Sequence, residues 1–130
     1  MVANEWACEG AWPGTPESVA MAREFVAVHL AENLLSGLID PARLVTSELA
    51  TNAVRHAQTP FAVSIERSNG DLTLSVRDWS PDLPVAPESL ELADGGHGLK
   101  LVDALSVSWG VTVKTDGGKS VWARFRTTTS

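Results

Sequence analysis

Hydrophobic positions recur along this chain with two periods, and the change of period separates a helical first part from a strand-rich second part. After Thr15-Pro16, a typical helix start, apolar residues fall three or four positions apart, as on one face of an α-helix: Val19, Ala22, Val26 and Leu30. Before this helix, residues 6–12 contain two tryptophans and little periodicity, which suits a short edge strand. The first third of the chain is therefore expected to form a strand followed by a helix.

A second helix is predicted over residues 41–57, which are rich in Ala and Leu and contain no glycine. Asp40 is expected to cap this helix and Pro41 to occupy its first position. A helical wheel places its apolar side at Leu44, Val45, Leu49 and Ala53.

Glu48 and Asn52 lie four residues apart, so they share one face of the second helix, beside its apolar side. Burying a carboxylate and an amide is costly unless each has a polar partner. Two interpretations stay open for the helix alone: the pair holds something polar, or it lies partly exposed at the edge of the stripe. The second is slightly favoured until the rest of the chain is considered.

The second half of the chain alternates apolar and polar residues, which predicts half-buried strands at 61–66, 72–77, 107–113 and 121–125. Asn69-Gly70 is a strong hairpin signal, and Asp116-Gly117-Gly118 is a second turn. Residues 99–105 resume a helical pattern. Because each strand has one apolar face, we expect a two-layer α/β sandwich: a mixed, mostly antiparallel sheet with three main helices on one face.

Residues 79–98 are long for a loop in a compact domain, and such loops are usually functional or mobile. The segment carries three prolines and an acidic stretch, and it ends in Gly95-Gly96-His97-Gly98. Glycines that open a helix suit an anion, because free backbone amides and the helix dipole face it. The alternative is an ordinary turn.

Composition restricts the class of protein. The 130 residues suffice for one domain, and the net charge of −6 with a pI of about 4.9 argues against a nucleic-acid surface. Cys8 is alone and cannot form an internal disulfide, no apolar run approaches membrane-spanning length, and the first residues lack the layout of a signal peptide. A cytoplasmic protein without direct contact to nucleic acid or membrane is expected.

Four segments, in this order, resemble the motifs of the Bergerat-fold (GHKL) ATPases, which include gyrase, histidine kinases and MutL. Ser47–Ala57 looks like the N box, Val76–Asp78 stands where the first glycine box would be, Gly95–Leu99 looks like the second glycine box, and Gly118–Trp122 is similar to the closing strand. The closest resemblance is to the anti-sigma-factor serine kinases and their single-domain ATP-binding relatives. It covers residues 16–125, and the N box is its most specific element.

The resemblance implies a role for each matching position. Glu48 would be the general base, Asn52 would hold Mg²⁺ against the phosphates of ATP or ADP, and Asp78 would accept a hydrogen bond from the adenine amino group. Ser120 would join the water network beside the base. The second glycine box would close over the phosphates with Gly95, Gly96, His97, Gly98 and Leu99. Residues 79–98 would form a mobile lid over the nucleotide.

The resemblance also implies partners: an anti-anti-sigma protein of the STAS type that is phosphorylated on serine, and a sigma factor that is sequestered. One departure affects this expectation, because Trp79, Ser80 and Pro81 follow Asp78 where the superfamily carries glycines. A nucleotide-gated binding module with little or no kinase activity therefore remains the alternative, and a partner protein that has lost nucleotide binding is the least favoured. Whether the protein forms a homodimer is left open.

Overall fold

The structure is a computed structural model that describes residues 5–80 and 97–127. Within these ranges the chain forms five strands and three α-helices, which are, in chain order, β1 (Trp6–Trp12), α1 (Pro16–Glu32), α2 (Ile39–Asn52), β2 (Phe61–Ser68), β3 (Asp71–Asp78), α4 (His97–Leu105), β4 (Ser108–Val113) and β5 (Lys119–Arg126). A 3₁₀ turn, Ser36–Leu38, precedes α2, and a π-helical turn, Ala53–Ala57, continues it.

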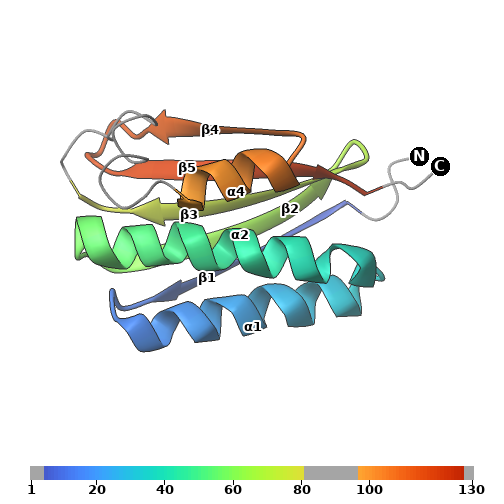
Figure 1. Cartoon of the computed structure of the whole chain (residues 1–130), viewed down its shortest axis with the longest axis horizontal. Coiled ribbons are helices and arrows are strands. Elements are labelled where there is room, and N and C mark those ends of the chain that lie inside the picture. Colours follow the sequence, from blue (N-terminus) through green and yellow to red (C-terminus); the bar gives the residue numbers. More distant parts are fainter. Residues whose placement is uncertain (1–4, 81–96, 128–130) are drawn as a thin grey trace.

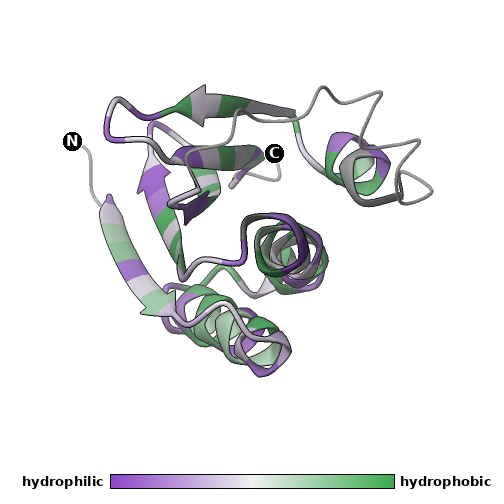
Figure 2. Cartoon of the chain, turned by 90° about the vertical axis from the view of Figure 1, so that its left-hand side faces the viewer, coloured by the Kyte–Doolittle hydropathy of each residue, from purple (hydrophilic) through white to green (hydrophobic). Residues whose placement is uncertain are grey.

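The strands form one sheet in the order β1-β2-β3-β5-β4, and each neighbouring pair is antiparallel. All three helices cover the same face of this curved sheet (Figures 1 and 2). The predicted two-layer α/β architecture is therefore confirmed. The sheet was expected to be mostly antiparallel, and every neighbouring pair of the described strands is antiparallel.

The core lies between the sheet and helices α1 and α2, where the predicted alternation places the apolar residues. Phe61, Ile65, Leu72 and Leu74 are fully buried on the helix-facing side of β2 and β3. Burying an apolar side chain of this size contributes about 1.5–3 kcal/mol. β4 differs, because its inward-facing Val111 and Val113 are exposed although they follow the same alternation.

Helix α2 corrects three details of the sequence prediction. It begins at Ile39, directly after the 3₁₀ turn, and no side chain caps it, so Asp40 lies inside the first turn instead of capping it. Leu44 is 49% exposed, whereas Val45, Leu49 and Ala53 are buried as expected. The apolar stripe of this helix is therefore narrower than the wheel suggested.

The last turn of this helical segment is wider than an α-turn. The Gln58 N–H donates to the carbonyl of Ala53 at 3.2 Å, and Gln58 itself adopts a left-handed conformation with φ of 58°. Turns of this kind are often found at functional sites. The π-helical turn directly follows Asn52, the asparagine of the predicted N box.

Several segments meet at one end of the molecule, on the left of Figure 1. These are the ends of α2 and β3, the start of α4 and the turn that joins β4 to β5. They carry the predicted site residues, so the fold gathers segments that are far apart in the sequence. No helix in the described part of the chain is long and apolar enough to span a membrane.

Candidate nucleotide site

Asp78 lies at the end of β3, the middle strand of the sheet, where the segments that carry the predicted site residues meet. It is the last residue of β3, and its side chain is only 7% exposed. One carboxylate oxygen, Oδ1, accepts a hydrogen bond from the backbone N–H of Ser80 at 3.0 Å. The other, Oδ2, lies 2.9 Å from the Nζ atom of Lys119, whose side chain is 18% exposed. Asp78 therefore forms a largely buried ion pair, and burial of this kind is tolerated only when the charge is paired.

The strand register explains why these two charges meet. Across the sheet, one row of directly paired residues reads Trp12, Phe61, Asp78, Lys119 and Val113. Phe61 is fully buried in the core beneath α1 and α2, so the row lies on the helix-facing side. The sheet thus presents one acidic and one basic group side by side, with apolar side chains on both flanks.

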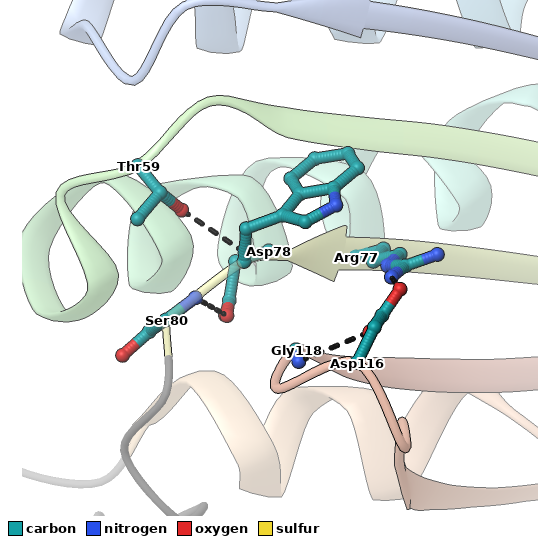
Figure 3. A network of polar contacts seen from close by, with 7 residues as sticks. Thr59, Arg77, Asp78, Ser80, Asp116 and Gly118 are labelled. Carbon is teal, nitrogen blue, oxygen red and sulfur yellow. Dashed lines mark hydrogen bonds and ion pairs between the residues drawn. The ribbon is translucent and has the colours of Figure 1, made fainter.

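The backbone directly after Asp78 is held by hydrogen bonds, although this chain lacks the glycines that the superfamily carries there. The backbone N–H of Trp79 donates to Thr59 Oγ1 at 3.1 Å, and Ser80 is buried (Figure 3). The Ser80 N–H, as described, turns back onto the Asp78 carboxylate. Trp79 and Ser80 thus form an ordered turn, and the hydrogen bond from Ser80 holds the Asp78 carboxylate in place. Glycines at these positions would make the backbone more flexible.

Gly118 approaches the same segment from β5. A Cβ atom at this position would lie 2.4 Å from the carbonyl oxygen of Asp78, which real structures do not tolerate. Glycine is therefore required for the turn between β4 and β5 to pack against the end of β3.

We expect Gly118→Ala to destabilise the protein by about 1–3 kcal/mol, because the added methyl group must push two backbone segments apart. Thermal unfolding would measure the loss. Gly37→Ala is the matched control, because a Cβ there meets nothing within 4 Å. Equal melting temperatures for the two variants would contradict the close packing of Gly118.

Arg77 makes the corresponding contacts on the other face of the sheet. Its Nη2 donates to Asp116 Oδ2 at 2.5 Å, and its guanidinium lies 4.9 Å from the centre of the Trp79 ring (Figure 3). The hydrogen bond from Arg77, with a smaller contribution from the Gly118 N–H, lowers the pKa of Asp116 below the ordinary value of 3.8. Asp116 therefore remains ionised at neutral pH and anchors the turn between β4 and β5.

The position of Ser120 corrects the sequence prediction. Ser120 pairs with Arg77, not with Asp78, and lines a concavity on the helix-free face of the sheet together with Ser75, Arg77 and Trp122. Its side chain therefore lies on the opposite face from the Asp78 carboxylate and cannot join a network beside it. Lys119, which the motif comparison passed over, occupies that place.

Glu48 and Asn52 are both half-buried on α2, one turn apart. Glu48 lines a groove with Lys100, Leu101 and Ala104 of α4 in the part of the chain that the structure describes. Asn52 is the last residue of α2 and Asp78 the last of β3, and these two elements end at the same end of the molecule (Figure 1). Neither residue is part of the closed core.

The second glycine box is described only in part. Gly95 and Gly96 lie outside the described residues, as does most of the predicted lid. The residues His97, Gly98 and Leu99 form the first turn of α4, so this helix begins two residues earlier than its apolar pattern predicted. In the described part of the chain α4 starts at His97, at the end of the molecule where α2 and β3 also end (Figure 1). The N-terminus of a helix suits a phosphate, because its first backbone amides have no partner within the helix.

These residues fit a nucleotide with a magnesium ion. The buried carboxylate of Asp78 suits a base with an exocyclic amino group, and the apolar neighbours in its row suit the ring. Among the described residues no three His, Cys, Asp or Glu side chains gather as a metal site. Mg²⁺ usually takes one or two ligands from the protein and the others from phosphates and water, and the side-chain oxygen of Asn52 could supply one ligand of this kind.

The fold and this site define a class of protein. Residues 12–125 match the family model of the histidine kinase-like ATPase domain, and the chain belongs to this family. Family membership implies a nucleotide-binding site. No curated protein is significantly similar to the chain.

Among solved structures, the fold is similar to that in the crystal structure of the RsbU and RsbW domains of Rv1364c from Mycobacterium tuberculosis. The TM-score is 0.71 at 20% sequence identity, and the match covers 93% of this chain. The chain spans 32% of the length of that protein. A likeness at this level of identity shows the shared fold.

Proposed function

We propose that this protein is an ATP-binding regulator that acts as an anti-sigma-factor serine kinase. It would bind Mg-ATP, phosphorylate a serine of an anti-anti-sigma partner of the STAS type, and sequester a sigma factor. The observation that carries the proposal is the buried carboxylate of Asp78, the last residue of β3, at the end of the molecule where α2, which finishes with the half-buried Asn52, also ends. The family membership and the resemblance of Ser47–Ala57 to the N box of these kinases support it.

In this proposal, Asp78 accepts a hydrogen bond from the adenine amino group, and Asn52 holds Mg²⁺, which would neutralise charge on the phosphates. Glu48 is the general base. It takes the proton from the partner's serine hydroxyl while that oxygen bonds to the γ-phosphorus and the bond to ADP breaks. Its place in a groove between α2 and α4 supports this role, because the partner's serine would have to reach the carboxylate from outside the core.

The second candidate is a nucleotide-gated binding module that transfers no phosphate. One observation favours it: Trp79 and Ser80 replace the glycines after Asp78 and form a fixed turn, held by Thr59 and by the Asp78 carboxylate. Both candidates need nucleotide binding. They differ in whether labelled phosphate from γ-labelled ATP reaches a STAS-type protein encoded near the gene.

We expect the protein to bind ATP and ADP in the presence of Mg²⁺, more weakly in EDTA, and to prefer them to the guanine nucleotides. Guanine presents an oxygen at position 6, which a carboxylate repels. Isothermal titration of the four nucleotides, with and without Mg²⁺, would measure this preference. Absence of binding would overturn the proposed function, and equal affinity for ATP and GTP would overturn the role of Asp78.

A further inference from the structure

Lys119 is placed to read the base together with Asp78. It follows Gly118, whose close contact with the Asp78 carbonyl sets the distance between the two backbones. It is also the direct cross-strand neighbour of Asp78, and its ammonium group touches the carboxylate at 2.9 Å. The two side chains therefore present a hydrogen-bond acceptor and a donor next to each other.

Their surroundings suit a flat ring. The same row of the sheet continues into Phe61 on one side and Val113 on the other, and the next row inward holds only valines beside them: Val63, Val76, Val121 and Val111. Val113 and Val111 are exposed on this face, so apolar surface remains open beside the charged pair. Asp78 and Lys119 are the polar residues in these two rows, whose other named members are apolar.

An acceptor beside a donor complements adenine, which carries the amino group at position 6 next to the acceptor nitrogen N1. An amide side chain reads adenine in DNA by the same combination of one donor and one acceptor. Lysine has three N–H donors, so Lys119 can donate to N1 while it keeps its contact with Asp78. The ion pair need not break when the base binds, and Asp78 is never left as an unpaired buried charge.

We infer that Lys119 is a second specificity-determining residue, which donates a hydrogen bond to N1 of the adenine ring that Asp78 recognises through the amino group. This inference rests on the proposed nucleotide-binding function. Lys119 would thus recognise N1 directly. The motif resemblance had implied a water network with Ser120 beside the base instead.

The test compares ADP with 1-deaza-ADP, in which a C–H group replaces N1. We expect the wild-type protein to bind ADP about tenfold or more tightly than the analogue, because a hydrogen bond from a charged donor is lost. Lys119→Met should bind the two nucleotides with nearly equal affinity. The ratio is the readout, so any general change in the pocket caused by the substitution cancels.

Lys114→Met is the matched control. It removes the same charge close to Lys119 in the structure, but Lys114 lines the concavity on the helix-free face. This variant should keep the wild-type ratio. Equal binding of ADP and 1-deaza-ADP by the wild type, or an unchanged ratio in Lys119→Met, would overturn the inference while nucleotide binding itself stands.

The wild-type comparison requires no variant, so equal binding of ADP and 1-deaza-ADP would overturn the inference even where Lys119→Met does not fold. Lys119→Gln gives a further check, since a neutral donor should retain part of the discrimination. Absence of ADP binding by the folded wild-type protein would instead overturn the proposed function, and the inference with it.

Discussion

Replacing Glu48 by Ala or Gln is expected to slow phosphate transfer to the partner's serine by about two to four orders of magnitude. Neither side chain can accept the proton of the serine hydroxyl. Nucleotide binding should be preserved, because Glu48 is half-buried in the groove beside α4 and lies outside the buried row that holds Asp78. The rate would be measured with γ-labelled ATP and the partner protein, and the affinity by titration with ATP.

Glu24→Gln is the matched control, since Glu24 is an exposed carboxylate on α1. It should transfer phosphate at the wild-type rate. Glu48→Gln is the sharper of the two test variants, because it keeps the size and polarity of the side chain. If Glu48→Gln is as fast as the wild type, Glu48 is not the base; if the wild type phosphorylates no partner, the binding-module candidate gains.

Asp78→Asn is expected to lower the affinity for ADP roughly 10- to 150-fold, the usual range for loss of a hydrogen bond to a charged group. The amide can turn its N–H groups toward the amino group of adenine, where a donor meets a donor. The preference for adenine over guanine should fall as well. Titration of ADP and GDP against both proteins would give the change in affinity and in preference.

Asp116→Asn is the control for loss of an ion-paired carboxylate at this end of the molecule. Asp116 is exposed and pairs with Arg77 on the other face, away from the base, so this substitution should change the affinity for ADP far less than Asp78→Asn does. Thermal unfolding without ligand would show how much of the effect of Asp78→Asn comes from the lost contact to Lys119. An unaltered ADP affinity in folded Asp78→Asn would rule out its role at the base.

Much of the fold was predictable because its signals are local. Alternation identified β2 and β3, Asn69-Gly70 identified their hairpin, and Pro16 identified the start of α1. The start of α2 was not predictable from Asp40, because a 3₁₀ turn leads into the helix and removes the need for a side-chain cap.

The candidate site was predicted less completely than the fold. Motif order pointed to Glu48, Asn52 and Asp78, but it also pointed to Ser120, because a motif does not state which face of a strand a residue occupies. The period of two along β5 could have given the answer: Ala123 and Phe125 are buried, so Lys119 faces the helices and Ser120 faces away. The contact between Lys119 and Asp78 depends on pairing between distant strands, which no local pattern encodes.

Arg77 and Asp78 are consecutive, and they point to opposite faces of the sheet. Arg77 forms an ion pair with Asp116, in the turn between β4 and β5, on the helix-free face. Asp78 forms one with Lys119, the first residue of β5, on the other face. Asp116 and Lys119 lie close together in the chain. A ligand that displaces one of these two residues therefore also acts on the short backbone segment that carries the other. Binding equilibria that share such an element are linked and reciprocal. A protein that settles on the helix-free face and shifts Asp116 would therefore change the affinity for nucleotide by the same factor by which nucleotide changes the affinity for that protein.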